Sequence, residues 1–380
     1  MITTMYTLAF TKLLPLLLTG AGIGFLITIH EFGHFIFAKL FNIGVPVFSI
    51  GFGPGLIKKR IGATEYRLSL IPLGGYCAIQ MDSDPEAGMV TPDPEAAPLD
   101  PAQSFDTKPF WQKLLVLLGG ILFNIAFAYI AFIGLHCGTR PKVVTEIIAT
   151  AITEKSPAAK SRIAIGDRIT GYDGITFGSG SASVHEQIRT FLDTIAAKPQ
   201  QKMLLAITTK DMQEKVRRVT LGETADKAGF LGVAMEIKQV PIEGQYESDT
   251  FFDAIHKGIG LTNFYIKNTF AIIPSKFKRR NLDGLVGPLG LFSYAYTSAQ
   301  QGLRSLLYFL STFSVTLAIM NLIPIGALDG GQLLFTLIEG ITRRRLPRKL
   351  KEGIIIGSWI LFMLLTITLL YRDVLGFIGA

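Results

Sequence analysis

Four stretches of the chain are apolar and contain no charged residue. They cover residues 13–29, 114–135, 306–325 and 354–370, which is 17, 22, 20 and 17 residues. About 20 apolar residues in a helix cross the hydrocarbon core of a bilayer. The first stretch continues into the apolar residues after His34 and has no small-residue cleavage site, so we expect it to be retained rather than removed as a signal peptide. The pattern predicts a polytopic α-helical membrane protein with four transmembrane helices.

The remaining segments differ in pattern from these helices. Glycine-punctuated, β-rich sequence predicts a β-hairpin loop, too apolar for a solvated loop and so in contact with the bilayer or a cleft. An acidic, proline-rich segment predicts a linker, and a longer segment of mixed periodicity predicts a compact α+β domain. An amphipathic helix then lies either on the membrane surface or on that domain. The predicted segments are transmembrane helices at 8–41, 112–136, 305–331 and 353–371, the β-loop at 48–80, the linker at 81–111, the α+β domain at 142–221 and the amphipathic helix at 249–280.

Composition agrees with a membrane protein. Of the 380 residues only 17% are charged, against about 25% in an average soluble domain, and mean hydropathy is +0.41. The 37 basic and 29 acidic residues give a net charge of +8, which we assign to membrane anchoring rather than to nucleic acid. Two cysteines are too few for a disulfide scaffold.

A basic turn sets the expected orientation. The turn between the third and fourth helices carries Arg343, Arg344, Arg345, Arg348, Lys349 and Lys351, and such clusters remain in the cytoplasm. This places the segment 36–112 inside, and both termini and the segment 136–305 outside. The basic residues at 276–280 then fall on the outer side, against the trend. Cys77 and Cys137 lie on opposite sides and cannot pair.

The chemistry is concentrated in the sequence His30-Glu31-Phe32-Gly33-His34. On a helix, positions i and i+4 share a face, so both imidazoles can bind one metal ion beside Glu31. Ionisable residues at membrane depth are costly and usually functional. A third ligand must come from elsewhere, and Asp329 is the best placed carboxylate because it follows the third predicted span at about the depth of His30.

These motifs resemble a known family. His30–His34 and Asn321-x-x-Pro324-x-x-x-x-Asp329-Gly330-Gly331 are similar to the two signature motifs of the site-2 protease family of intramembrane zinc proteases, in the bacterial branch that regulates sigma-E. The order of segments is similar too, with 48–80 as a membrane-re-entrant β-loop. Residues 156–174 resemble a circularly permuted PDZ domain, and Gly119, Gly120 and Asn124 resemble the second span of the family. Many members of this branch have two PDZ domains, whereas this chain shows signals for one.

The resemblance implies a set of roles. His30, His34 and Asp329 would hold Zn²⁺, and Glu31 would be the general base. Asn321 and Asn124 could bind the backbone of the substrate, although a helix–helix hydrogen bond is equally open for Asn124. The implied substrates are single-pass membrane proteins, such as anti-sigma factors or remnant signal peptides, in the bacterial cytoplasmic membrane. The site would face the cytoplasm, the PDZ-like domain would be extracytoplasmic, and the bilayer but not nucleic acid would be a partner.

Two other functions remain open from sequence. One is a catalytically silent membrane scaffold that binds peptides through its PDZ-like domain, although such a protein would be expected to lose one of the four site residues. The other is a transporter with a metal ion in its path, which would need ionisable residues in several spans. The PDZ-like domain itself either binds newly exposed C-termini or excludes substrates with bulky outer domains.

Overall fold

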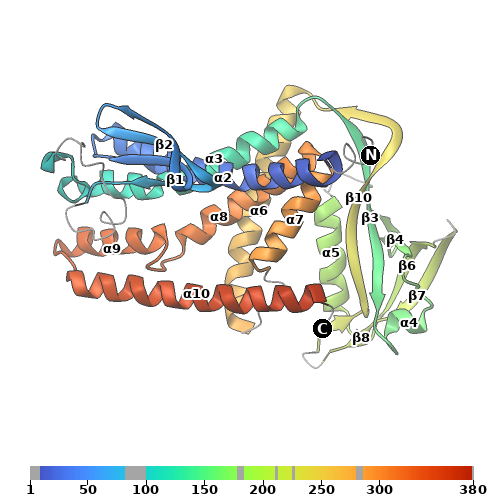
Figure 1. The fold of residues 1–380 in the computed structure, drawn as a ribbon. Coiled ribbons are helices and arrows are strands. Elements are labelled where there is room, and N and C mark those ends of the chain that lie inside the picture. Colours follow the sequence, from blue (N-terminus) through green and yellow to red (C-terminus); the bar gives the residue numbers. More distant parts are fainter. Residues whose placement is uncertain are drawn as a thin grey trace. The chain divides into compact units, whose positions relative to one another are not determined.

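The structure is a computed structural model that describes residues 9–81, 100–177, 184–209, 213–224, 227–279 and 286–378. The chain forms two compact units. One unit combines Met1–Cys137 with Asp249–Ala380, and the other is Gly138–Ser248. Figure 1 gives the elements of both. The second unit is therefore an insertion between two parts of the first.

Helices dominate the first unit. Four of them are long and apolar enough to cross a membrane: Thr11–Leu40, Phe110–His136, Leu303–Leu322 and Arg348–Leu375. They agree with the four spans predicted from hydropathy. The helical elements of this unit are η1 (Ala9–Leu13), α2 (Leu14–Leu40), η3 (Pro101–Gln103), η4 (Phe105–Thr107), α3 (Phe110–His136), α6 (Phe251–Arg279), α7 (Pro288–Gln300), α8 (Leu303–Leu322), α9 (Asp329–Thr342) and α10 (Arg348–Ile378). Most of the predicted linker at 81–111 lies outside the described residues.

Strands β1 (Val47–Ile61) and β2 (Thr64–Ala78) form an antiparallel pair that doubles back on itself. Val47 pairs with both Glu65 and Ala78, so the end of β2 returns along the first half of β1. The loop packs closely on α2, because a Cβ on Gly24 would lie 2.0 Å from the carbonyl oxygen of Pro72. Many of its apolar side chains are exposed: Ile50, Phe52, Leu56, Ile57, Ile61, Leu68, Leu70, Ile71 and Leu73.

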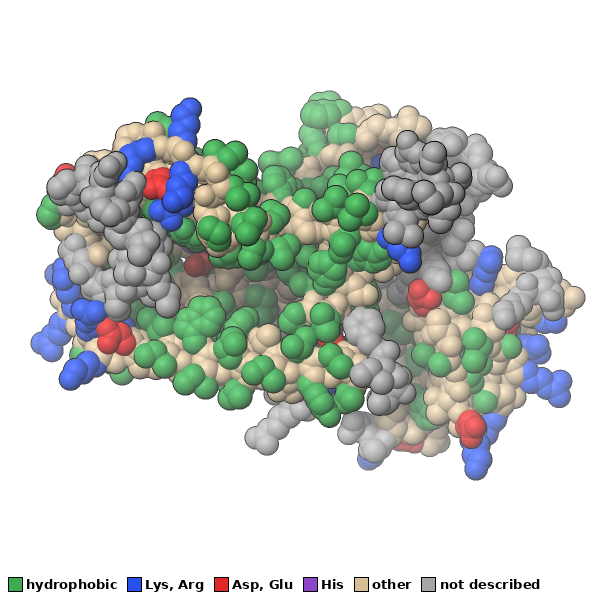
Figure 2. Space-filling model, viewed as in Figure 1, with side chains coloured by type: hydrophobic (Ala, Val, Ile, Leu, Met, Phe, Trp, Pro, Cys, Tyr) green, Lys and Arg blue, Asp and Glu red, His purple; other side chains and the backbone are tan. Residues whose placement is uncertain are grey.

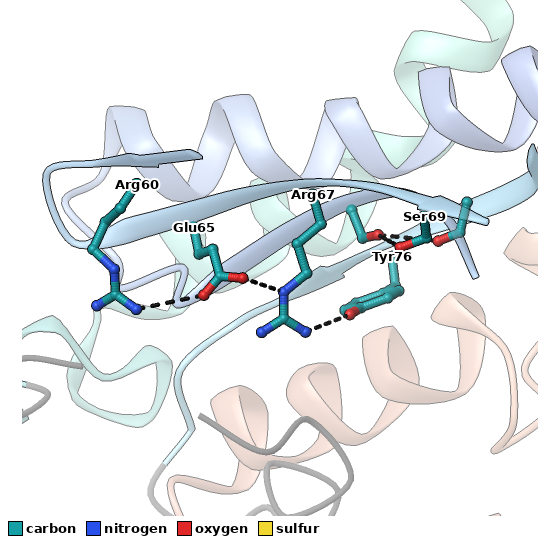
Figure 3. A network of polar contacts seen from close by, with 7 residues as sticks. Arg60, Glu65, Arg67, Ser69 and Tyr76 are labelled. Carbon is teal, nitrogen blue, oxygen red and sulfur yellow. Dashed lines mark hydrogen bonds and ion pairs between the residues drawn. The ribbon is translucent and has the colours of Figure 1, made fainter. Parts of the chain in front are cut away.

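A buried ion-pair network fastens the strands of this loop to one another (Figure 3). Arg67 donates from Nε to Glu65 and from its guanidinium to the hydroxyl of Tyr76, at 2.5 and 3.3 Å. Arg60 approaches the other carboxylate oxygen of Glu65 at 3.4 Å. The hydrogen bond from Arg67 lowers the pKa of Glu65, so this contribution to stability is present at neutral pH and is lost as the pH falls through that lowered value.

Helix α6 packs on the bundle of the first unit. The hydroxyl of Tyr129 on α3 donates to Asn263 at 2.6 Å, and Tyr265 stacks on Phe132 with ring centroids 5.6 Å apart. The hydroxyls of Tyr265 and Tyr308 are 2.6 Å apart, which joins α6 to α8. Helix α6 is therefore part of the first unit, and the placement of the segment 249–280 on the membrane surface or on the α+β domain stays a prediction.

Helix α10 contacts its neighbours at a few polar points. The Asp373 carboxylate accepts hydrogen bonds from the backbone N–H groups of Gly287 and Gly290, at 3.2 and 2.9 Å, at the start of α7. Ser358 accepts one from Gly326 at 3.1 Å. Between Ile354 and Leu370 the surface of the helix is mostly apolar and exposed, and Figure 2 shows hydrophobic side chains along the helix. Such a surface suits a lipid environment.

The second unit is built on an antiparallel sheet with strand order β10-β3-β4-β6-β7, to which β5 adds beside β4. Its elements are β3 (Thr139–Ile152), α4 (Pro157–Lys160), β4 (Arg168–Tyr172), β5 (Ile175–Thr176), α5 (Val184–Ala197), β6 (Lys202–Thr208), β7 (Glu214–Thr220), β8 (Gly222–Glu223), β9 (Gly229–Phe230) and β10 (Val233–Ser248). Phe191 of α5 packs over Ile169 and Leu205 of the sheet. Because β10 pairs with β3, the unit continues past residue 221, where we predicted the domain to end.

Candidate metal centre

Helix α2 places His30 and His34 one turn apart in its last third, with Glu31 directly after His30. Both histidines are buried, at 7% and 6% exposure. Their Nε2 atoms are 3.4 Å apart. Residues four apart lie on the same face of a helix, so this spacing brings two imidazole nitrogens close together.

Asp329 supplies the third group at this point. Its Oδ2 lies 3.0 Å from Nε2 of His30 and 3.3 Å from Nε2 of His34. This oxygen is buried, and among the described residues it has no partner with hydrogen-bond geometry. Three potential ligand atoms thus converge, and the carboxylate oxygen among them has its bonding capacity unused.

The spacing of these atoms fits zinc. Zinc binds imidazole nitrogen and carboxylate oxygen at about 2.0–2.1 Å in a tetrahedron, and two ligands of such a tetrahedron are about 3.3 Å apart. The three separations of 3.0, 3.3 and 3.4 Å match that edge length. Three protein ligands leave the fourth position for water or substrate, which is the arrangement of a catalytic rather than a structural site.

A break between two helices positions Asp329. Helix α8 ends at Leu322 and α9 begins at Asp329. The tight turn between them requires glycine after the aspartate: a Cβ on Gly330 would lie 2.3 Å from the carbonyl oxygen of Ile323, and one on Gly331 would lie 2.2 Å from that of Ile325. The carboxylate also stands at the N-terminus of α9, where the helix dipole favours negative charge.

One face of α3 surrounds the two imidazoles. Val116, Gly120 and Asn124 follow one another at intervals of four residues and so lie on one stripe. The Nδ1–H of His34 donates to the carbonyl oxygen of Val116 at 2.8 Å. At Gly120, an added Cβ would lie 2.5 Å from Cε1 of His30 and 2.6 Å from Nε2 of His34. Val116 therefore fixes the ring of His34 by a hydrogen bond, and Gly120 leaves space for the rings of both histidines.

Glu31 is tied to the β-loop. Its Oε2 accepts a hydrogen bond from the backbone N–H of Cys77 at 3.1 Å. Cys77 stands opposite Phe48 in the antiparallel ladder, and its N–H points away from that partner toward α2. The carboxylate beside the two histidines is thus held by the returning end of β2.

The two asparagines predicted to bind substrate differ in their burial and in their contacts. Asn124 is fully buried, and its Nδ2 lies 3.2 Å from Nδ1 of His30, which is the helix–helix contact that the sequence left open. Asn321 is half-buried in the last turn of α8, eight residues before Asp329. Gly120 was included in the resemblance to the second span of the family, and it acts through the absence of a side chain. No feature of the sequence indicated the roles of Val116 and Cys77, since both act through backbone groups.

Four helices of membrane length, together with two histidines, an aspartate and a glutamate gathered at one point, are the features of a membrane metallopeptidase. Residues 19–365 match peptidase family M50, and the chain belongs to this family. That confirms the resemblance inferred from the motifs at 30–34 and 321–331.

Similar proteins of comparable length occur in several lineages. A protein of Synechocystis whose name describes it as a zinc metalloprotease is 29% identical over 92% of this chain and 92% of its own. One from Clostridium perfringens, named in the same way, is 29% identical over 92% and 95%. The membrane metalloprotease ARASP of Arabidopsis thaliana chloroplasts is 26% identical over 92% and 76%. A PDZ domain of an SdrC-like protein from Listeria innocua matches 24% of this chain with 19% identity and a TM-score of 0.20, covering 93% of that domain.

Proposed function

We propose that this chain is a zinc-dependent endopeptidase that hydrolyses peptide bonds of transmembrane segments. The observation that carries the proposal is the triangle of His30, His34 and Asp329, whose ligand atoms have the separations of a tetrahedral zinc site. Relatives that span nearly the whole chain are named as zinc metalloproteases. The site lies on helices of membrane length, so its substrates are peptide bonds that enter the bilayer.

The chemistry divides among four side chains. Zinc held by His30, His34 and Asp329 supplies a Lewis acid for the scissile carbonyl and acidifies a water molecule. Glu31, which directly follows His30 in sequence, takes the proton of the attacking water and returns it to the leaving amine. The water molecule for hydrolysis can reach the site beside Asp329, because 22% of the side chain of Asp329 is exposed.

The β-loop presents the substrate. Peptide bonds in a transmembrane helix are shielded by its internal hydrogen bonds, so the segment must unwind before it is cut. The edge of the returning end of β2 can pair with the unwound segment by strand addition, and the same edge contacts Glu31 through Cys77. Half-buried Asn321 binds the substrate backbone near the metal ion.

The proposed cellular location and orientation rest on the distribution of basic residues in the loops between the helices. The basic turn at 343–351 supports a location in the cytoplasm of a bacterial cell for the end of α9 and the start of α10. The β-loop and the metal centre are then toward the cytoplasm, and both termini and the inserted unit are extracytoplasmic. The inserted unit is a PDZ-like domain that selects substrates by size, and the substrates are single-pass proteins such as anti-sigma factors or remnant signal peptides.

A purified-protein assay tests the proposal. The chain in detergent or liposomes is incubated with a single-pass reporter protein, and the products are located by mass spectrometry. We expect a cut inside the transmembrane segment, abolished by a zinc chelator and restored by zinc. We also expect two helix-breaking residues near the cut to increase the rate. Cleavage only in the soluble flanks would contradict an intramembrane activity.

A further inference from the structure

The side-chain amide of Asn124 is in direct contact with a proposed metal ligand. It lies on α3, is fully buried, and reaches Nδ1 of His30 on α2 at 3.2 Å. Its backbone carbonyl accepts a hydrogen bond from the hydroxyl of Ser314 on α8 at 2.9 Å. One residue thus joins the helix of the histidines to the helix that leads to Asp329.

His34 shows what a metal ligand needs from its second nitrogen. A carbonyl oxygen can only accept, so the hydrogen bond of 2.8 Å to Val116 requires a proton on Nδ1 of His34. The lone pair of a neutral ring is then on Nε2, which is the atom that faces Asp329. Val116 therefore sets the tautomer in which His34 can bind a metal ion.

His30 also needs a proton on Nδ1 to bind a metal ion through Nε2. Asn124 contacts Nδ1 of His30 as Val116 contacts Nδ1 of His34. Nε2 of His30 faces Asp329, so metal binding again requires the proton on Nδ1. With Nδ2 of the amide toward the ring, two donors would then face each other. The amide oxygen, Oδ1, is buried and has no hydrogen-bond partner among the described residues. A half-turn of the amide about the Cβ–Cγ bond brings this unused acceptor to Nδ1.

We propose that Asn124 is the positioning residue of His30: its Oδ1 accepts the hydrogen bond from Nδ1–H of His30 and so directs the Nε2 lone pair to the metal ion. The inference deepens the proposed zinc site and depends on it. It replaces substrate binding as the role of Asn124, because a fully buried amide that is engaged with a ligand is not available to a peptide. Partners of this kind change metal affinity by about 10–100-fold when they are removed.

Zinc affinity separates this role from others without any measure of proteolysis. The full-length wild type, Asn124→Ala and Asn124→Asp are titrated against a chromophoric chelator, and visible spectra are recorded with Co²⁺ in place of zinc. Aspartate has nearly the same size as asparagine and accepts hydrogen bonds. Alanine is smaller, and its side chain cannot accept a hydrogen bond. Tyr129→Phe is the matched control, since it removes a hydrogen bond of 2.6 Å between α3 and α6 away from the metal centre.

We expect Asn124→Ala to bind zinc about 10–100-fold more weakly and to show an altered Co²⁺ spectrum. Asn124→Asp should bind zinc at least as tightly as the wild type and retain the spectrum, as should Tyr129→Phe. Thermal unfolding confirms that each variant is folded. If Asn124→Ala does not fold, Asn124→Leu takes its place: leucine has nearly the size of asparagine but no hydrogen-bond acceptor, so it should show the same weakened zinc binding.

Two results overturn the inference while leaving the zinc site in place. They are unchanged zinc binding by folded Asn124→Ala, and weak binding by Asn124→Asp. A wild type that binds no zinc at all would instead overturn the proposed function, and this inference with it.

Discussion

The backbone N–H of Cys77 donates a hydrogen bond of 3.1 Å to Oε2 of Glu31. The bond connects the β-loop to the helix of the two histidines, and it fixes one oxygen of the carboxylate that we assign to proton transfer. It also places that carboxylate at the strand edge where an unwound substrate would pair. In the proposed mechanism, the orientation of the base and the presentation of the substrate therefore depend on the same segment.

Removing this donor should impair catalysis without releasing the metal ion. Cys77→Pro lacks the N–H, and proline is tolerated on an edge strand where that group points away from the neighbouring strand. We expect kcat to fall by about 10-fold or more, with the zinc content unchanged. Cys77→Ala keeps the N–H and should remain within about 2-fold of wild type. Equal activity of the two variants would show that the hydrogen bond is dispensable.

The contact of Gly120 with both imidazoles predicts a steric effect on the metal centre. In Gly120→Ala the methyl group would lie within 2.6 Å of atoms of His30 and His34, so the rings must move. We expect zinc to bind at least about 10-fold more weakly, which is the size of effect seen when ligand orientation is disturbed. Gly134→Ala is the control on the same helix, where an added Cβ meets no atom within 4 Å. Equilibrium dialysis of both variants measures the difference, and equal affinities would contradict the packing of α2 against α3.

The sequence predicted which three side chains converge at the proposed metal centre better than it predicted their surroundings. His30 and His34 could be paired from helical spacing alone, and Asp329 from its place after a span. Val116 and Cys77 act through backbone groups that any residue carries, so no pattern marks them. Strand β10 was missed at the end of the predicted domain because Pro241 and Gly244 interrupt its alternation, and only pairing with distant β3 makes it a strand.

Excision of the inserted unit should separate substrate selection from hydrolysis. Thr139 and Ser248 pair at its two ends, so a short Gly/Ser linker can join Cys137 to Asp249. If the unit is a size filter, the shortened protein should cut a small substrate at the wild-type rate and should also cut one with a bulky folded outer domain. If the unit captures new C-termini, the shortened protein should cut a pre-trimmed substrate more slowly. Continued rejection of the bulky substrate by a correctly inserted protein would exclude the filter.

The proposed orientation predicts different reactivity for the two cysteines. Cys137 is exposed at the end of α3 and should react with a membrane-impermeant maleimide in intact spheroplasts. In the proposed orientation Cys77 would lie on the cytoplasmic side. Burial raises the pKa of its thiol, so little thiolate forms near neutral pH. It should react slowly, and only after the membrane is opened. Rapid labelling of Cys77 in intact spheroplasts, measured by mass shift in a Cys137→Ser background, would reverse the topology.

The account rests on the assignment of ligation to His30, His34 and Asp329 and of proton transfer to Glu31. Zinc content and cleavage of a single-pass reporter, measured on the same preparations of wild type, Glu31→Gln and Asp329→Asn, test it most directly. The wild type should hold one zinc ion per chain and cut the reporter. Glu31→Gln should retain the zinc and lose cleavage by at least about 100-fold, as expected for loss of a general base, and Asp329→Asn should lose both. Full zinc occupancy in Asp329→Asn, or cleavage by Glu31→Gln at the wild-type rate, would contradict the assignment.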